Sequence, residues 1–408
     1  MLFGVELKYR GAGLDMDSIR TLREDELEDS IQVTATAFHV PLDEEQVNER
    51  KRILDPNTII GLFYQGKLVS KLSLLPLHIW LGGEMFPMGG IASAATLPEH
   101  RRKGYFQKLL YHSACEMKEK GMMFSYLMPF SYSYYRKFGW EVIQSFKEFN
   151  LCPNDLRHGA TLREYVYTRG KLKWHELNPV YEKYAQSFTG MLTRERWWWE
   201  SYYSFYKKGE VVTVSNADGI QGYLVYDIHQ ESKTMTIHEI IHLNEEARLS
   251  MLDFLANHDS VIDRVILRTP VQDEMSFLLR NPAVSQQIKP GFMGRIMDVR
   301  SCLSKYPFIK TGKSFDFIMK ITDPFLSWND GIIRVLVNED GEVYIMDMTD
   351  TDKELDLSCD IGAFTAILFG YQNPLFLKET GRIQASDMLL HFFNEAIPRK
   401  IPYAVDYF

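Results

Sequence analysis

The segment 89–110 constrains the fold of this chain most, because it changes from a strand pattern to a helix pattern across a short basic turn. Small residues fill 89–96, and the turn Arg101-Arg102-Lys103-Gly104 precedes a run with apolar residues at helical spacing. The first N–H groups of a helix have no partner within the helix, and the helix dipole adds partial positive charge there. A glycine in such a turn lets the backbone approach an oxygen atom closely. The segment therefore indicates a strand–turn–helix unit that binds a phosphate, with a solvated basic helix start as the alternative.

The order of residues in the basic turn resembles the pyrophosphate loop of the GNAT acetyltransferases, whose motif is Arg/Gln-x-x-Gly-x-Gly/Ala. Arg101 to Gly104 fit this motif, whereas Phe106 stands where a second small residue is usual. The enhanced intracellular survival (Eis) family of GNAT proteins also tolerates a bulky residue there, and more of this chain resembles that family. The resemblance implies acetyl-CoA as co-substrate and no metal ion.

The size and composition of the chain are those of a globular protein with several domains. Its 408 residues predict two or three domains, and 45% hydrophobic and 25% charged residues are ordinary for a soluble protein. The net charge of −8 disfavours nucleic acid or an anionic membrane as partner and suits a cationic substrate, although it serves solubility equally well. The four cysteines form no Cys-x-x-Cys pair, residues 2–16 do not resemble a signal peptide, and no apolar run is long enough to span a membrane. We therefore expect a cytoplasmic protein with reduced thiols.

A repeated pattern predicts two similar α/β units. Residues 59–73 form a hairpin pattern around Gln65-Gly66, and residues 211–226 repeat it around Asn216-Ala217-Asp218-Gly219. Each hairpin is followed by a further strand and a helix. The helix of the second unit begins at Asn244-Glu245-Glu246, a capped start without basic residues, so we expect no cofactor there.

The remaining chain predicts a third domain and completes the expected architecture. Two segments, 292–299 and 324–331, resemble landmarks of the domain shaped like a sterol carrier protein that ends Eis proteins. The resemblance therefore implies an α/β (α+β) chain with tandem GNAT domains followed by that third domain. The expected parts are an extension at 1–16, an acetyl-CoA-binding GNAT domain at 17–150, a degenerate GNAT domain at 151–295 and the sterol-carrier-like domain at 296–408.

The resemblance also assigns the residues that hold acetyl-CoA. In GNAT folds the strand before the basic turn pairs its backbone with the pantetheine arm, which here places that role on Ala94, Ala95 and Thr96. The diphosphate is expected to lie, largely on backbone N–H groups, at Arg102, Lys103, Gly104, Tyr105, Phe106 and Gln107. The second contact with the acetyl arm falls on Phe130 and Ser131. From residue types alone, 94–96 is equally a plain buried strand with a small-residue face.

An aromatic segment contains the expected general acid. The family pattern Tyr-x-x-Phe-Gly-aromatic aligns with Tyr135 to Trp140, which makes Tyr135 the acid that protonates the departing thiolate. A phenol with a pKa of about 10 can do this at neutral pH without being ionised. Tyr134 is the nearest rival, and on a helix its side chain would point elsewhere. An aromatic packing turn is the alternative without chemistry.

The end of the sequence supplies the expected general base. Residues 398–408 are apolar and aromatic up to Phe408, which predicts a tail packed inside the protein rather than a polar free one. In the Eis family the terminal α-carboxylate reaches the active site of the first domain, so the resemblance gives that role to the main-chain carboxylate of Phe408. Burial beside aromatic surface would raise its pKa from about 3.5.

Two further motifs admit other functions. His238-Glu239-Ile240-Ile241-His242 matches the zincin pattern, but its β-rich surroundings predict a strand, and zinc chemistry needs a helix there. Arg194-Glu195-Arg196-Trp197-Trp198-Trp199 could stack bases, but the acidic chain favours helix packing or the wall of a substrate pocket. The nearby tyrosines and Phe205 are expected to lie mostly in the core.

The sequence thus predicts an acetyl-CoA-dependent N-acetyltransferase that acts on primary amines in a ternary complex. The resemblance implies aminoglycoside-like polycationic acceptors held by acidic groups around a large cleft, and it implies a homohexamer. A protein lysine or a polyamine is an alternative acceptor. A zinc peptidase through His238, Glu239 and His242, or a non-catalytic carrier of an apolar ligand, is the alternative from another class.

Overall fold

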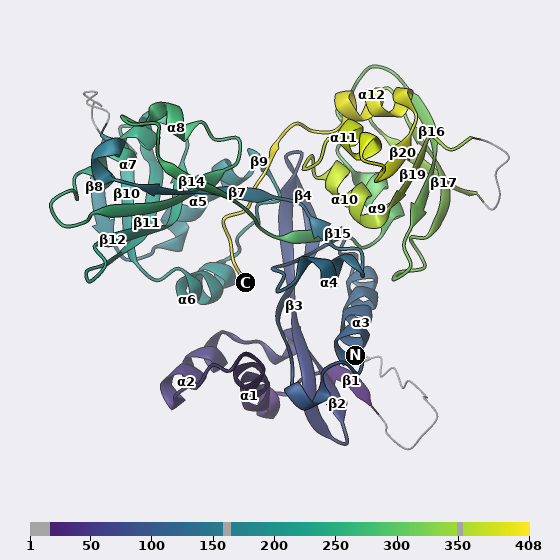
Figure 1. Cartoon of the computed structure of the whole chain (residues 1–408), viewed down its shortest axis with the longest axis horizontal. Coiled ribbons are helices and arrows are strands. Elements are labelled where there is room, and N and C mark those ends of the chain that lie inside the picture. Colours follow the sequence, from purple (N-terminus) through teal and green to yellow (C-terminus); the bar gives the residue numbers. More distant parts are fainter. Residues whose placement is uncertain (1–16, 158–164, 349–353) are drawn as a thin grey trace.

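The computed structural model of the chain describes residues 17–157, 165–348 and 354–408, and the predicted extension 1–16 lies outside them. The described residues form three α/β domains, two of them flanking the first on opposite sides (Figure 1). Within these ranges no helix is both long enough and apolar enough to cross a membrane. The predicted α/β class and the order of two similar domains and a third, different one are confirmed.

The first domain is built on a seven-stranded sheet with the order β1-β2-β3-β4-β5-β15-β6. Its strands are β1 (Ser18–Thr21), β2 (Ile59–Tyr64), β3 (Lys67–Leu81), β4 (Glu84–Thr96), β5 (Phe124–Leu127), β15 (Met293–Ile296) and β6 (Glu141–Val142). Its helices are α1 (Leu27–Phe38), α2 (Glu44–Ile53), α3 (Tyr105–Glu119) and α4 (Tyr132–Arg136). The predicted hairpin is β2–β3, whose turn residues Gln65 and Gly66 both have positive φ.

Helix α3 packs closely on the sheet because β4 carries glycine where the two elements meet. Leu109, Leu110 and Met117 of α3 are fully buried. A Cβ at Gly89 would lie only 2.3 Å from Sδ of Met117, so any larger residue would push the helix away from the strand. The small-residue run of the sequence is therefore needed for the packing of the helix that follows it.

The second domain repeats this arrangement with a sheet of the order β14-β7-β13-β12-β11-β10-β8. Its strands are β7 (Ser145–Leu151), β8 (Val166–Gly170), β10 (Glu210–Asn216), β11 (Gly219–His229), β12 (Thr234–His242), β13 (Arg264–Pro270) and β14 (Ser285–Pro290). Its helices are α5 (Trp174–Ala185), a π-helical turn (Trp198–Tyr203), α6 (Ser204–Tyr206), α7 (Glu245–Ala256) and α8 (Met275–Leu278). The second predicted hairpin is β10–β11.

The two sheets exchange strands, so the expected boundaries at 150 and 295 do not coincide with them. Strand β7 (Ser145–Leu151) leaves the first domain to pair with β13 and β14 of the second. Strand β15 (Met293–Ile296) returns and inserts between β5 and β6 of the first sheet. The segment 292–299, expected in the third domain, thus begins with a strand of the first domain.

The third domain has a five-stranded sheet with the order β18-β17-β16-β19-β20. Its strands are β16 (Phe315–Thr322), β17 (Gly331–Val337), β18 (Val343–Met348), β19 (Leu357–Asp360) and β20 (Ile383–Ala385). Its helices are α9 (Val299–Lys305), α10 (Ile361–Leu368), α11 (Pro374–Glu379) and α12 (Asp387–Ala396). An aromatic core joins sheet and helix, with the rings of Phe315 and Phe392 stacked at 4.4 Å.

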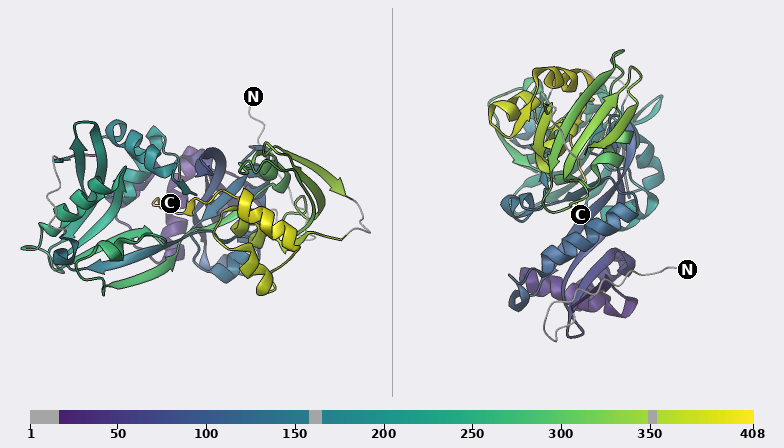
Figure 2. Two further views of the ribbon diagram at one scale, coloured as in Figure 1. Left: turned by 90° about the horizontal axis from the view of Figure 1, so that it is seen from above. Right: turned by 90° about the vertical axis from the view of Figure 1, so that its right-hand side faces the viewer.

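The C-terminal segment leaves the third domain and runs between the other two. Strand β21 (Ile401–Pro402) pairs in parallel with β9 (Phe188–Thr189) of the second domain. In the view from above, the end of the chain lies between the second and third domains, over the first (Figure 2). The last residue is buried, as the apolar tail predicts, and it lies against the first domain, as the resemblance implies.

Candidate active site

The site begins where two neighbouring strands of the first sheet separate. Strands β4 and β5 pair in parallel from Met88 opposite Phe124 to Ile91 opposite Leu127. Beyond this point β4 continues to Thr96 with β3 as its partner. The β3–β4 register shifts between Lys71 and Ser73, and Ser93 has a φ of 48°, so β4 bulges as it leaves β5. The separation leaves the end of β4 with backbone groups that another molecule can pair with.

A cavity of about 500 Å³ lies against the free end of β4. Eight of the eleven expected cofactor residues line it: Ala94, Ala95, Thr96, Arg102, Gly104, Tyr105, Phe106 and Phe130. The other three, Lys103, Gln107 and Ser131, are not part of this lining. The lining also includes Arg101 of the turn motif and the rival Tyr134, together with three residues that were not expected from the sequence: Ala37, Phe38 and His100.

The basic turn and the start of α3 have the geometry of an anion site. Arg102 and Gly104 both have left-handed φ values, 62° and 78°, which lets the turn point its backbone at the cavity. Gly104 precedes α3 without a side-chain cap, and the first turn of α3 contains no acidic residue. The first N–H groups of this 15-residue helix are thus left for a ligand. In the second domain, by contrast, the Asn244 side chain caps α7 and two glutamates fill its first turn.

The guanidinium group of Arg101 forms hydrogen bonds with two segments that line this cavity. Its Nε donates to the carbonyl oxygen of Thr96 at 3.2 Å, and its Nη2 donates to that of Ala37 at 2.7 Å. The side chain therefore joins the free end of β4 to the end of α1. The turn motif identifies Arg101 in the sequence. Its partner Ala37 on α1 could not be identified in this way, because it lies 64 residues away.

Tyr135, the expected general acid, is 2% exposed and lies beside the cavity. Its ring centroid is 6.2 Å from Phe106 and 5.4 Å from Phe130. Burial raises the pKa of Tyr135 well above that of a free phenol, and Tyr134 raises it further. Tyr134 itself lines the cavity, and burial raises its pKa as well. Both tyrosines therefore keep their protons at neutral pH.

Phe408 is buried against the first sheet. Its ring stacks on Phe292 at 4.9 Å and meets the edge of Trp198 at 6.1 Å. A Cβ at Gly90 would lie 2.9 Å from Cε2 of Phe408, so the ring rests directly on β4 beside the point where the strands separate. The neighbouring Tyr407 is half exposed and lies 5.9 Å from the ring of Tyr206.

Comparisons with known proteins agree with this geometry. Residues 18–143 match the model of an acetyltransferase (GNAT) domain, residues 190–296 match a second model of that description, and residues 299–405 match a sterol carrier protein domain. The chain is a GNAT N-acetyltransferase.

Relatives of similar length and fold are known for this acetyltransferase. An uncharacterized N-acetyltransferase of Streptomyces griseus is 20% identical over 402 residues, which cover 90% of this chain and 93% of that one. A protein of unknown function from Enterococcus faecalis, described as a probable N-acyltransferase, has a TM-score of 0.86 at 22% identity and covers 97% and 100% of the two chains. Eis1 from Mycobacterium abscessus has a TM-score of 0.78 at 21% identity, over 96% and 100%. The structural matches establish a shared fold.

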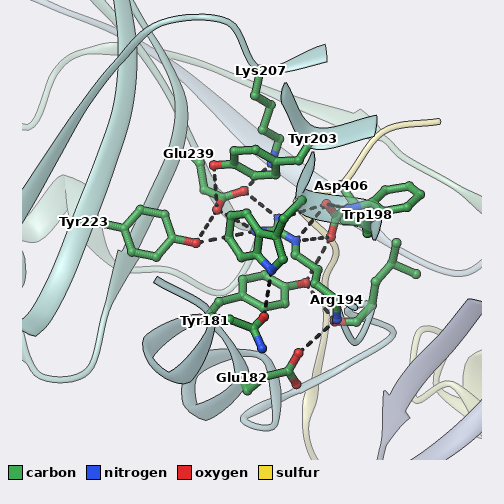
Figure 3. A network of polar contacts seen from close by, with 12 residues as sticks. Tyr181, Glu182, Arg194, Trp198, Tyr203, Lys207, Tyr223, Glu239 and Asp406 are labelled. Carbon is green, nitrogen blue, oxygen red and sulfur yellow. Dashed lines mark hydrogen bonds and ion pairs between the residues drawn. The ribbon is translucent and has the colours of Figure 1, made fainter. Parts of the chain in front are cut away.

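A buried ionic network anchors the tail of the acetyltransferase (Figure 3). Arg194 is 3% exposed and forms ion pairs with Glu239 at 2.7 Å and with Asp406 at 2.8 Å. Lys207 also pairs with Glu239, so two cations face two carboxylates. Neutral donors complete the network: Tyr181 and Trp198 to Asp406, and Tyr203 and Tyr223 to Glu239.

The network holds Asp406 two residues before Phe408, which fixes where the end of the tail lies. Despite burial, Arg194 and Lys207 lower the pKa of Glu239, and the two carboxylates raise that of Arg194. Glu239 and Arg194 therefore stay charged inside the protein. The sequence did not predict this network, because residues 194, 239 and 406 belong to distant segments. The Trp198 and Trp199 side chains are almost fully buried, which confirms packing rather than base stacking.

A second cavity, of about 220 Å³, borders β4 at Ala92 and Ser93. It shares Phe38 with the cofactor cavity, and its residue Ser93 precedes Ala94 of that cavity. Tyr202, Phe205 and Tyr206 of the second domain line it. Tyr202 and Tyr203 also belong to the buried core, as expected, whereas Tyr206 is exposed. The charged residues that line this cavity are Lys71 and Arg50.

The zinc alternative fails on geometry. His238, Glu239 and His242 lie on strand β12, as predicted. Four residues along a strand separate the two histidines by about 13 Å, too far for one ion. Glu239 belongs to the buried network, and His238 contacts Asp227 at 3.1 Å. Across the described ranges, no group of three His, Cys, Asp or Glu side chains is placed to hold a metal ion.

Proposed function

We propose that this GNAT acetyltransferase is of the Eis type and transfers acetyl from acetyl-CoA directly to a primary amine while both substrates are bound. The observation that carries the proposal is the pair of cavities that meet at β4. One adjoins the uncapped start of α3, the other lies beyond the Ser93 bulge, and both include Phe38. Two ligands can thus bind next to each other along one strand, which is what direct transfer requires.

The cofactor cavity fits acetyl-CoA in its chemistry. The left-handed turn at Arg102 and Gly104 and the first N–H groups of α3 suit a diphosphate. The backbone of Ala94, Ala95 and Thr96 suits the amide groups of a pantetheine arm, and the small side chains leave room for it. Acetyl-CoA supplies an activated acetyl thioester.

Tyr135 is assigned as general acid. In the reaction the amine nitrogen forms a bond to the acetyl carbon, the carbon–sulfur bond breaks, and the sulfur takes up a proton. Because burial raises its pKa, the Tyr135 hydroxyl holds a proton at neutral pH that it can donate to this sulfur. Tyr134, one residue away and on the cavity wall, is the rival donor.

The proton that the amine loses needs an acceptor. We assign this role to the main-chain carboxylate of Phe408, because the network around Asp406 and the contact of the Phe408 ring with Gly90 bring this residue to β4.

The acceptor class is narrowed by the second cavity. An aminoglycoside-like polycation, the acceptor implied by the resemblance, gains nothing from a lining whose charged members are Lys71 and Arg50. The same repulsion disfavours a polyamine, and a protein lysine carries one cation only. The hexamer implied by the resemblance remains part of the proposal and is tested by light scattering.

The test is release of CoA thiol from acetyl-CoA by the purified chain across a panel of primary amines, with products identified by mass. The expected result is an acetylated amine and one thiol released per acetyl transferred. Absence of acetyl-CoA binding together with silence for every amine would refute the proposed function.

A further inference from the structure

Lys71 is a buried cation without a counter-charge. It is 1% exposed, lies on β3, and its Nζ donates to Oγ of Ser93 at 2.6 Å. An ammonium group has three N–H donors, and within the described ranges no carboxylate forms an ion pair with this one. Burial lowers the pKa of Lys71 to about 7, and Arg50 lowers it further. A buried cation in this state is one that an anionic ligand would stabilise.

Arg50 is the second cation of the same cavity. It lies on α2, and its guanidinium carbon is 5.7 Å from the centroid of the Phe205 ring. Among the described residues it has no ion pair, whereas its neighbour Glu49 pairs with Lys208. The acidic residues of α2 line a separate surface hollow together with Asn48 and Arg52. The acidic side chains of α2 therefore face away from the cavity, whereas Arg50 faces into it.

The rest of the lining is mainly apolar and aromatic. Four rings, Phe38, Tyr202, Phe205 and Tyr206, surround the space together with aliphatic side chains of α1 and α2. At about 220 Å³ the cavity is smaller than the ~300–1,000 Å³ typical of sites for drug-sized ligands. It suits a small molecule with one aromatic group better than a molecule of several sugar rings.

We propose that the acceptor is a small amine with an aromatic side group and a carboxylate beside the amine, as in an aromatic α-amino acid, and that Lys71 and Arg50 hold the carboxylate. The inference rests on the proposed function and names its substrate class. Arginine and lysine are suited to carboxylates, and charge-assisted hydrogen bonds in a dry site are strong ones.

The position of Lys71 in the sheet sets how far the carboxylate of the acceptor can lie from its amine. Lys71 lies opposite Ala95 in the β3–β4 register, and its ammonium contacts Ser93, next to Ala94. These are the positions assigned to the pantetheine arm. Because the Lys71 ammonium lies 2.6 Å from Oγ of Ser93 on β4, a carboxylate held at Lys71 lies beside that strand. An amine on the adjacent carbon atom can then reach the thioester.

The experiment compares two amines that differ only in the carboxylate, phenylalanine and phenethylamine. Thiol release gives kcat/KM for each, with spermidine and kanamycin as polycationic amines. We expect the wild-type protein to prefer phenylalanine. Lys71→Met and Arg50→Gln should each lower the ratio of kcat/KM for phenylalanine over phenethylamine about 10- to 100-fold.

Matched controls separate this effect from a general loss of charge. Lys67→Met lies on the exposed end of the same strand, and Arg52→Gln lies on α2 in the surface hollow. Both should leave the ratio unchanged. Thermal unfolding and acetyl-CoA affinity of all four variants show that the fold and the cofactor site persist.

The outcomes distinguish the inference from the proposed function. The inference is overturned if the protein prefers phenethylamine or a polycation. It is also overturned if the ratio of kcat/KM for phenylalanine over phenethylamine stays constant in Lys71→Met and Arg50→Gln. Either result leaves the acetyltransferase activity standing. A protein that acetylates none of these amines and fails to bind acetyl-CoA overturns both.

Discussion

Replacing Lys71 by methionine should stabilise the ligand-free protein, and most strongly at low pH. The folded pKa of about 7 lies well below the 10.5 of an unperturbed lysine. Below pH 7 the side chain is charged in both states, and the folded state bears the full cost of burying that charge. Between pH 7 and pH 10.5 the unfolded chain binds more protons than the folded one, so stability rises with pH. Above pH 10.5 the lysine is neutral in both states, so the cost of burying its charge disappears.

The magnitude follows from the size of the pKa difference. A difference of 3.5 pKa units corresponds to about 5 kcal/mol at pH 6 and falls to about 2 kcal/mol at pH 9. Methionine fills nearly the same volume, and the repacking and the lost contact with Ser93 together cost about 2 kcal/mol. Lys71→Met should therefore gain about 3 kcal/mol at pH 6 and almost nothing at pH 9.

The assay is differential scanning calorimetry of the wild-type protein, Lys71→Met and the exposed control Lys67→Met at pH 6, 7.5 and 9. The transition temperature of Lys71→Met should exceed that of the wild type at pH 6, and the gap should close as pH rises. The control should remain within about 0.5 kcal/mol of the wild type throughout. A gap that does not change with pH would refute the reasoning, because the lysine would then not titrate near neutral pH.

Other substitutions test the catalytic assignments. Tyr135→Phe should lower kcat about 10²- to 10⁴-fold with little change in acetyl-CoA affinity by calorimetry, whereas Tyr134→Phe should not lower kcat in this way. A larger loss of kcat in Tyr134→Phe would assign the general acid to Tyr134. Gly104→Val should do the opposite and weaken acetyl-CoA binding at least tenfold, because a β-branched residue at a φ of 78° strains the turn. Two residues added after Phe408 should lower kcat, since they convert the carboxylate to an amide, and normal turnover would contradict the base assignment. Asp406→Asn should destabilise the protein by about 3–5 kcal/mol in thermal unfolding, because Arg194 and Lys207 then share Glu239 as their one carboxylate in the buried network.

Local features of this chain could be predicted from the sequence where neighbouring residues decide the structure. The Gln65-Gly66 turn predicts its hairpin because both residues adopt a positive φ. The basic turn and the run 89–96 predict the strand–turn–helix unit, and eight of the expected cofactor residues line one cavity. The β-rich surroundings of His238 and His242 predict a strand, and a strand is found.

The exchange of β7 and β15 between sheets could not be predicted in this way. Both segments have the length and composition of ordinary strands, and strand pattern does not specify which sheet a strand joins. The choice depends on contacts far along the chain. Arg295 of β15, for example, is completely buried and pairs with Asp323 of the third domain.

The sequence by itself determined the elements, the two related units, the basic turn and the apolar tail, because these depend on residues within one turn or one strand of each other. Only the tertiary structure decided where the tail ends and what charge the cavity around Lys71 carries. The tail is placed by Arg194, Glu239 and Asp406, and the cavity by Lys71 and Arg50, all distant in sequence. A net charge of −8 describes the whole chain, whereas the buried Lys71 and the half-buried Arg50 decide the electrostatics of one small space, since burial removes water that would screen them.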